Sequence, residues 1–331
     1  MDTIQNTLNE LASKYDKRVT VFEIEIDKLN DSSLTLSGRV LDESQLEDIH
    51  RVFPDLQVDT ASIHILSRPN LSRLHVATNI TGLYEKPTFG MPLSSELHYG
   101  TDLEVLEEQE CWVFTRQKDG YLGWAHRPYL SDGMIENPSH YIIEPVIELR
   151  AEPSITSSVL TRIVSGTGVT VQENKGEWTN IIANKTGWIP SSALRAIKDI
   201  PQSLDARRAS LLKDSARMIG VPYLWGGTSG NGIDCSGFAR LLHHWVGIEI
   251  PRDADMQSAA AKRVEPPFEI GDLFFFSEDD SDRHHITHVG MGLGGWKVIH
   301  SSRGNNGVYI DDLQEKESLR KIFTHAGSFL R

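Results

Sequence analysis

Residues 221–238 read VPYLWGGTSGNGIDCSGF, and apolar residues at helical spacing follow the cysteine of this stretch. The apolar positions are Phe238, Leu241, Leu242, Trp245 and Val246. Because they lie three or four residues apart, they predict a helix with one face in a core. Cys235 then lies in the first turn, where unpaired backbone N–H groups and the helix dipole favour a thiolate over a thiol. Its own N–H points to where an oxyanion would develop, so the stretch predicts a nucleophilic cysteine.

Two histidines further along the chain supply a candidate base and a group to orient it. Residues 271–276 predict a buried strand, and residues 288–293 and 296–300 predict a hairpin. If residues 293–295 form a three-residue loop, His288 and His300 face each other on one side of the sheet, within hydrogen-bonding distance. A two-residue loop would instead place them on opposite faces.

The order of these motifs resembles the NlpC/P60 family of papain-like cysteine peptidases over residues 205–331. The matching segments are Pro222 to Gly237 with Asp234-Cys235-Ser236-Gly237, Gly271-Asp272-Leu273, His288-Val289-Gly290 and His300. The resemblance implies that Cys235 is the nucleophile, that His288 is the general base and that His300 orients His288. It implies no metal and no organic cofactor.

An internal repeat precedes this domain. The pairs Leu83 and Leu149, Pro87 and Pro153, Gly100 and Gly166, Val105 and Val171, and Trp112 and Trp178 share an offset of 66, and Gly123-Trp124 matches Gly187-Trp188 at 64. A constant offset followed by a slip of two predicts two copies of one module with one altered hairpin loop. Short alternating segments separated by turn residues favour small β-barrels, and the pattern resembles bacterial SH3-like domains over residues 71–198.

Residues 1–70 alternate helical and strand periods, which predicts a small α+β cap. Ser203 is the expected N-cap of the first helix after the repeats. The expected fold class is therefore α+β: a papain-like NlpC/P60 catalytic domain at 205–331, preceded by two SH3-like β-barrels at 71–138 and 139–198 and by the cap at 1–70.

Charge and cysteine content limit the partners and the compartment. The 33 Lys and Arg residues against 46 Asp and Glu residues give a net charge of −13, which argues against a nucleic-acid partner. No secretory signal and no stretch long enough to cross a bilayer is visible, and Cys111 and Cys235 lie in unrelated surroundings. We therefore expect a cytoplasmic protein without membrane or nucleic-acid partners. Residues 283–288 contain three histidines but lack a second ligand pair, so no zinc site is expected.

The order of two SH3-like domains before the peptidase domain is similar to cytoplasmic γ-D-glutamyl-L-diamino acid peptidases that recycle murein peptides. This similarity implies a murein tripeptide or tetrapeptide substrate with a free N-terminal L-Ala, cut between γ-D-Glu and meso-diaminopimelate or L-Lys. It implies that Tyr121 lines the amine end of the groove, with Glu96 as the nearest acidic candidate there. It also implies that Asp234 and Ser236 hold the substrate amine and peptide, and that Tyr223 lies near the oxyanion.

Alternatives stand beside these assignments. A carboxylate beside the nucleophile would raise the thiol pKa, so Asp234 needs another purpose: it pairs with a substrate ammonium group, or it only caps the helix. Other acyl transfer on the same fold, such as amidase, transglutaminase-like or lipid acyltransferase chemistry, is one alternative function. A non-hydrolytic peptidoglycan-binding protein with SH3-like modules is the other.

Overall fold

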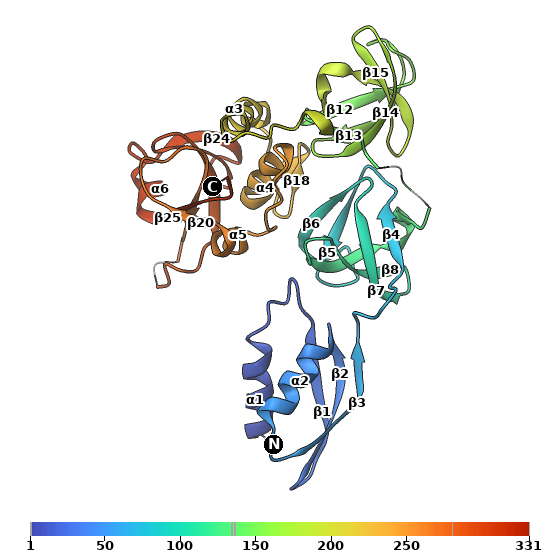
Figure 1. The fold of residues 1–331 in the computed structure, drawn as a ribbon, viewed down its shortest axis with the longest axis vertical. Coiled ribbons are helices and arrows are strands. Elements are labelled where there is room, and N and C mark those ends of the chain that lie inside the picture. Colours follow the sequence, from blue (N-terminus) through green and yellow to red (C-terminus); the bar gives the residue numbers. More distant parts are fainter. Residues whose placement is uncertain (1, 134, 136, 280, 331) are drawn as a thin grey trace. The chain divides into compact units, whose positions relative to one another are not determined.

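The computed structural model describes residues 2–133, 135, 137–279 and 281–330. Figure 1 shows the helices and strands of the chain, which divides into two units. The N-terminal unit comprises Met1–Leu74, Lys86–Thr88 and Asp102–Pro128, and the C-terminal unit comprises His75–Glu85, Phe89–Thr101 and Tyr129–Arg331. Within the described part of the chain, no helix combines the length and the apolar character that a membrane span requires.

The N-terminal unit begins with the predicted α+β cap. Its elements are α1 (Asp2–Ala12), β1 (Phe22–Leu29), β2 (Ser33–Val40), α2 (Glu43–Val52) and β3 (Gln57–Ile65). The sheet has the order β1-β2-β3, and α2 connects the parallel strands β2 and β3. A capping box between Asp42 and Gln45 starts α2. Leu8, Leu34 and Ile49 are buried between the helices and the sheet.

The two copies of the repeat form the same series of strands. The first copy contains β4 (Arg73–Val76), β5 (Ile80–Tyr84), β6 (Leu93–His98), β7 (Asp102–Gln109), β8 (Trp112–Arg116), β9 (Leu122–His126) and β10 (Leu130–Ser131). The second contains β11 (His140–Ile142), β12 (Val146–Arg150), β13 (Val159–Val164), β14 (Gly168–Lys175), β15 (Trp178–Ile182), β16 (Thr186–Pro190) and β17 (Leu194–Ala196). The second copy forms a seven-stranded sheet in the order β13-β12-β16-β15-β14-β11-β17.

The slip in the repeat lies in a hairpin loop, as predicted. Strands β5 to β8 begin 66 residues before β12 to β15, whereas β9 begins 64 residues before β16. The loop before β9 spans residues 117–121, and its counterpart before β16 spans only 183–185. Gly100 and Gly166 occupy equivalent turns at φ of 80° and 81°, a backbone conformation that glycine adopts without steric cost.

The C-terminal unit contains the predicted papain-like domain. Its helices are α3 (Leu204–Ser215), α4 (Cys235–Trp245), α5 (Ala254–Ala260) and α6 (Glu317–Ile322). Its strands are β18 (Thr228–Ser229), β19 (Gly232–Ile233), β20 (Lys262–Val264), β21 (Ile270–Phe276), β22 (His288–Leu293), β23 (Lys297–Ser302), β24 (Gly307–Asp312) and β25 (Phe323–Ser328). The main sheet is antiparallel in the order β20-β25-β21-β22-β23-β24. Ser203 caps α3 as predicted, because its Oγ accepts a hydrogen bond of 3.3 Å from the backbone N–H of Ala206.

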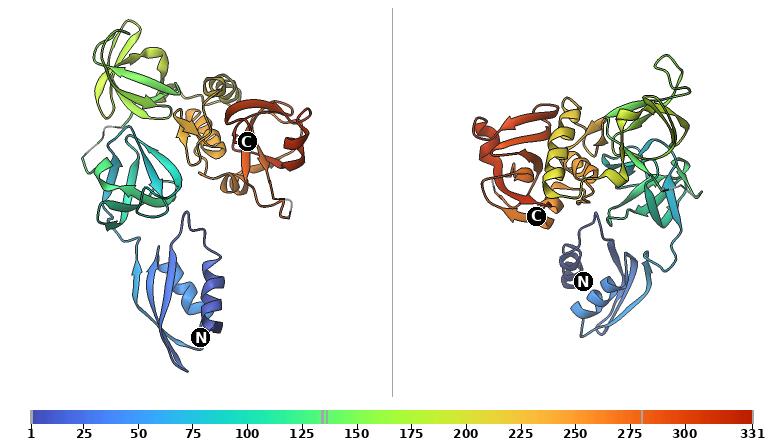
Figure 2. Two further views of the ribbon diagram at one scale, coloured as in Figure 1. Left: turned by 180° about the vertical axis from the view of Figure 1, so that it is seen from behind. Right: turned by 45° about the horizontal axis from the view of Figure 1, so that its top comes forward.

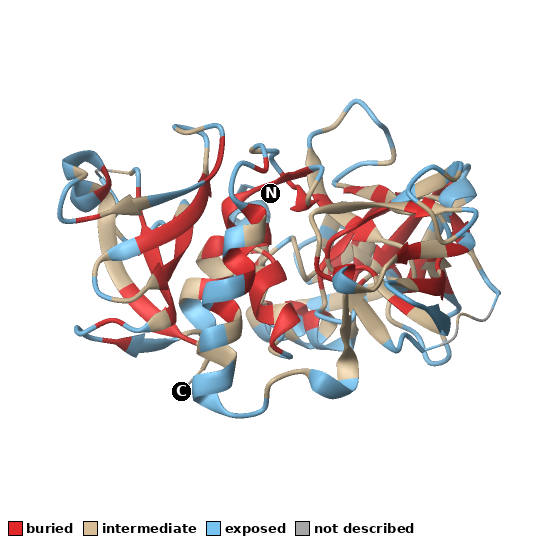
Figure 3. Ribbon diagram, turned by 90° about the horizontal axis from the view of Figure 1, so that it is seen from above, coloured by how far each residue is buried: buried red, intermediate tan, exposed pale blue. Residues whose placement is uncertain are grey.

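Helix α4 packs against β22 and β23, and the views of Figure 2 show it beside that sheet. Phe238, Leu242 and Trp245 are fully buried along its inner face. Figure 3 shows that buried residues also line the strands of the domain. Each such side chain contributes about 1.5–3 kcal/mol when it leaves water. This packing holds the first residue of α4 in a fixed place against β22.

Candidate active site

Cys235 is the first residue of α4 and is 8% exposed. Burial, followed by the charge of Asp234, raises the pKa of its thiol to about 12. Hydrogen bonds from the backbone N–H groups of Val289 and Ser236 lower the thiol pKa, but by less than burial raises it. The expectation that the helix N-terminus favours a thiolate is therefore wrong for the resting site, because desolvation exceeds the effect of the local N–H groups. Cys235 is a neutral thiol that needs a base.

His288 is the first residue of β22, a strand that packs against α4. Val289, the next residue, directs its backbone N–H to the sulfur of Cys235. Burial, together with the nearby His300, lowers the pKa of His288 to about 3. The ring is therefore neutral at neutral pH and free to accept a proton.

His288 and His300 share one face of the sheet, although the predicted loop is wrong. Met291 pairs with Ile299 and Gly292 with Val298, so the turn comprises residues 294–296 rather than 293–295. This register places His300 opposite Gly290, two residues from His288. A shift of two residues keeps both side chains on the same face. They meet diagonally, with 2.7 Å between Nε2 of His288 and Nδ1 of His300.

Gly290 makes this diagonal contact possible, and Gly290→Ala tests it. A Cβ atom at position 290 would lie 2.5 Å from Cγ2 of Val298 and 2.9 Å from Cβ of His300. We expect the displaced His300 to lower kcat by ~10-fold or more with little change in KM, because small errors in catalytic geometry are costly. The matched control is Gly304→Ala, since no atom lies within 4 Å of a Cβ built there. A folded Gly290→Ala enzyme with unchanged kcat would contradict this expectation.

The second ring nitrogen of His300 contacts Asp311 in β24, a residue that the sequence analysis missed. His300 Nε2 lies 2.9 Å from Oδ2 of Asp311. The same oxygen accepts hydrogen bonds from Lys316 Nζ at 2.6 Å and, more weakly, from Asn305 Nδ2 at 3.4 Å. The hydrogen bond from His300, and then that from Lys316, hold the pKa of Asp311 well below its usual range.

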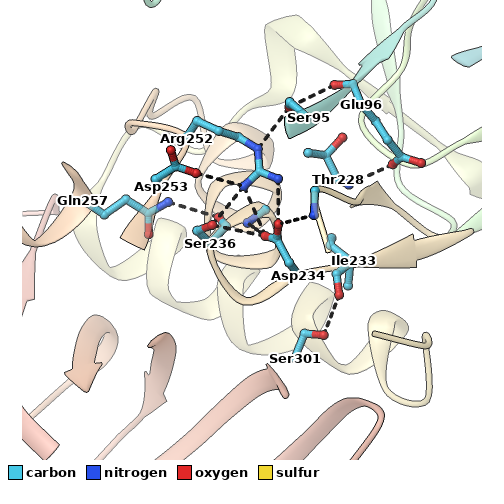
Figure 4. Close-up of polar contacts among 12 residues, drawn as sticks. Ser95, Glu96, Thr228, Ile233, Asp234, Ser236, Arg252, Asp253, Gln257 and Ser301 are labelled. Atoms are coloured by element: carbon cyan, nitrogen blue, oxygen red, sulfur yellow. Dashed lines mark hydrogen bonds and ion pairs between the residues drawn. The ribbon is translucent and has the colours of Figure 1, made fainter. Parts of the chain in front are cut away.

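Asp234 caps α4, which is the alternative that the sequence analysis left open. Its Oδ1 accepts hydrogen bonds from Gly237 N at 2.7 Å and from Ser236 Oγ at 3.1 Å. Its Oδ2 accepts one from Gly226 N at 2.9 Å. Arg252 adds a bidentate contact, at 3.2 Å to Oδ1 and 2.7 Å to Oδ2 (Figure 4). Both oxygens of Asp234 are therefore engaged within the protein.

Arg252 is the second residue that the sequence analysis missed. It is 1% exposed, and besides Asp234 its guanidinium contacts Ser95 Oγ at 3.0 Å and Ser236 Oγ at 2.9 Å. Its charge lowers the pKa of Cys235 and so opposes the effect of Asp234. A single arginine after Pro251 carries no pattern that would identify it in the sequence.

Glu96 in β6 lies against the segment that precedes Asp234. Its Oε2 accepts a hydrogen bond of 2.8 Å from the backbone N–H of Thr228, and its own N–H donates to Gly226 O at 3.1 Å (Figure 4). Burial raises the pKa of the Glu96 carboxyl. The structure therefore places this predicted residue near the cap of α4.

Tyr223 and Tyr121 are the remaining predicted site residues. Burial, and then the charges of Cys235 and Asp234, raise the pKa of Tyr223 to about 12, so its hydroxyl stays a donor. The guanidinium of Arg303 lies 5.7 Å from the centre of the Tyr223 ring. Tyr121 belongs to the N-terminal unit, where it is 5% exposed at the end of the loop before β9. Its place in a substrate site stays a prediction.

Three family models match the chain. The NlpC/P60 family model matches residues 220–326, the bacterial SH3 domain model matches 145–195, and the bacterial dipeptidyl-peptidase SH3 domain model matches 83–127.

Two bacterial peptidases and one crystal structure are similar to this chain. The chain is 30% identical over 264 residues to the γ-D-glutamyl-L-lysine dipeptidyl-peptidase of Bacillus subtilis, covering 70% of this chain and 82% of the relative. It is 26% identical over 260 residues to dipeptidyl-peptidase 6 of Lysinibacillus sphaericus, covering 74% and 93%. The crystal structure of an NlpC/P60 family protein from Bacillus cereus superposes with a TM-score of 0.67 at 22% identity, covering 78% of this chain and 100% of that one.

Proposed function

This chain belongs to the NlpC/P60 family, and from that premise we propose that it is a cysteine peptidase that cuts murein peptides between γ-D-Glu and the diamino acid that follows. The diamino acid is L-Lys or meso-diaminopimelate, and the substrate has a free N-terminal L-Ala. The relatives named γ-D-glutamyl-L-lysine dipeptidyl-peptidases support this substrate class. We further propose that the protein acts in the cytoplasm on recycled peptides, which cell fractionation would test.

One observation carries the proposed chemistry: a buried thiol at a helix N-terminus lies against the backbone N–H of Val289, and the preceding residue, His288, is a neutral imidazole in contact with a second imidazole. In the proposed reaction His288 removes the proton of Cys235 as the sulfur attacks the γ-carbonyl carbon. The backbone N–H of Cys235 and the hydroxyl of Tyr223 stabilise the oxyanion. His288 then protonates the leaving amine of the diamino acid, and a water that His288 deprotonates hydrolyses the thioester.

The amine end of the substrate is assigned to Glu96. Asp234 was the other candidate, but its two oxygens already accept hydrogen bonds from Arg252 and from backbone N–H groups. A substrate ammonium group at Asp234 would have to displace a buried arginine, which is costly. We therefore propose that Glu96 pairs with the ammonium group and that Ser236 contacts the peptide.

A substrate panel tests this function. We expect release of L-Ala-γ-D-Glu, seen by mass spectrometry, from L-Ala-γ-D-Glu-meso-diaminopimelate or its L-Lys counterpart. N-acetylation removes the ammonium charge and should lower kcat/KM by ~10-fold or more, since a charge-assisted hydrogen bond is lost. In the control Glu96→Gln, the values of kcat/KM for the free and the acetylated substrates should differ less than they do in the wild type.

Three outcomes would contradict parts of the proposal. Equal rates of hydrolysis of the free and the acetylated peptides would contradict the proposed amine site at Glu96. Products formed only from lipid or N-acetylmuramoyl substrates would indicate a different acyl transfer. Tight pelleting with intact cell wall and no hydrolysis would indicate a binding protein.

A further inference from the structure

A chain of polar side chains crosses three neighbouring strands of the main sheet. In β22 and β23, His300 lies opposite Gly290, and His288 is two residues before Gly290. In β23 and β24, His300 pairs with Tyr309, and Asp311 is two residues after Tyr309. Each step is two residues, so the three side chains share one face and follow a diagonal across the sheet. The contacts are 2.7 Å between the two imidazoles and 2.9 Å between His300 and Asp311.

Asp311 is the last of these three side chains, and its charge is fixed. Its carboxyl pKa is held far below the usual range, so it is ionised at neutral pH and can only accept hydrogen bonds. Nε2 of His300, 2.9 Å away, must therefore carry a hydrogen. Lys316 Nζ lies 2.6 Å from the same carboxylate and already balances its charge.

The direction of the remaining hydrogen bonds follows from this. A hydrogen bond between two imidazoles needs one lone pair, and an imidazole with its one hydrogen on Nε2 offers that lone pair on Nδ1. That nitrogen accepts from Nε2 of His288, 2.7 Å away, so Nε2 of His288 carries the hydrogen. The lone pair of neutral His288 then lies on Nδ1, the ring nitrogen left to take the proton of the thiol.

We propose that Asp311 is a positioning residue that fixes the tautomer of His300 and, through it, leaves Nδ1 of His288 as the proton acceptor for Cys235. This proposal rests on the proposed function, in which His288 is the base. Asp311 acts through His300 and does not contact the reacting atoms. Lys316 and Asn305 hold its carboxylate in place.

Asp311→Leu separates this role from a merely structural one. Leucine has nearly the shape of aspartate but accepts no hydrogen bond, and it leaves the ammonium group of Lys316 without its carboxylate. A hydrogen on Nε2 of His300 then has no acceptor and faces a cation, so we expect it on Nδ1 instead, and Nδ1 of His288 becomes protonated and cannot act as the base. We expect kcat to fall by ~10²-fold or more with KM nearly unchanged, which is the lower end of what a positioned general base contributes. The matched control is Asp312→Leu, at the neighbouring residue of β24, whose Oδ1 accepts from Gln314 N, and it should keep the wild-type kcat.

Two readouts do not depend on the substrate. In ¹⁵N-histidine-labelled protein, long-range ¹H–¹⁵N spectra should show hydrogen on Nε2 of His300 in the wild type and on Nδ1 in Asp311→Leu. Alkylation of Cys235 by iodoacetamide should slow in the variant by a similar factor to kcat.

These readouts separate failure of this inference from failure of the proposed function. Wild-type protein with hydrogen on Nδ1 of His300 would overturn the inference even if the variant did not fold. So would a folded Asp311→Leu protein with the wild-type tautomer and alkylation rate. If the tautomer and alkylation results hold while no γ-D-Glu peptide is cut, the proposed substrate is wrong and the inference about Asp311 stands.

Discussion

Cys235→Ala is expected to lower the rate of γ-D-Glu peptide hydrolysis by ~10⁴-fold or more, because the variant loses the atom that forms the acyl-enzyme. The fold should persist. The deleted sulfur belongs to a small side chain, and the packing of α4 depends on Phe238, Leu242 and Trp245 instead. The measurement is single-turnover release of L-Ala-γ-D-Glu, together with a melting curve for each protein.

The matched control for this prediction is Cys111→Ala. Cys111 is the other free cysteine, and it is exposed in the N-terminal unit. It should keep full activity, and iodoacetamide should inactivate this variant as it inactivates the wild type. Turnover of a folded Cys235→Ala protein at more than a trace of the wild-type rate would refute the proposed nucleophile.

The repeat and the general order of the site could be predicted because they depend on local patterns. The offset of 66 residues fixes equivalent turns such as Gly100 and Gly166, and the slip to 64 locates the shortened hairpin at residues 183–185. The alternating strands around His288 and His300 also predict correctly that the two side chains share a face. A register shift of two residues leaves both side chains on the same face, so this prediction is correct although the predicted loop is wrong.

Other features depend on contacts that no local pattern encodes. The hairpin turn lies one residue later than predicted, at 294–296, with glycine at two of its positions. Arg252 and Asp311 reach their partners 18 and 11 residues away in the sequence, across separate elements. The helix position of Cys235 suggests a low thiol pKa, whereas its burial, which only the folded core determines, raises it. Desolvation is a property of the whole environment, and the local pattern around Cys235 does not encode it.

Arg252→Met is expected to destabilise the C-terminal unit by about 3–5 kcal/mol, because it leaves the Asp234 carboxylate buried without its ionic partner. Methionine resembles the arginine stem in length, so loss of packing is small. The lost guanidinium contacts include those to Asp234, Ser95, Ser236 and Asp253. Chemical unfolding followed by circular dichroism measures the effect.

The same substitution should also affect the thiol. The charge of Arg252 lowers the pKa of Cys235, whereas the charge of Asp234 raises it. Removing the arginine alone therefore raises the thiol pKa further, and alkylation of Cys235 at a fixed neutral pH should slow in any Arg252→Met protein that stays folded.

The double variant Arg252→Met with Asp234→Asn shows whether charge is the cause. Asparagine is as good an N-cap as aspartate, so α4 keeps its cap while the unpaired buried charge disappears. We expect the double variant to be more stable than Arg252→Met alone and to alkylate faster, since the carboxylate that raises the thiol pKa is gone. If the double variant were no more stable than the single one, the unpaired charge of Asp234 would not be the cause of the destabilisation. The ion pair between Asp234 and Arg252 would then not be what stabilises the N-terminus of α4, where Cys235 lies.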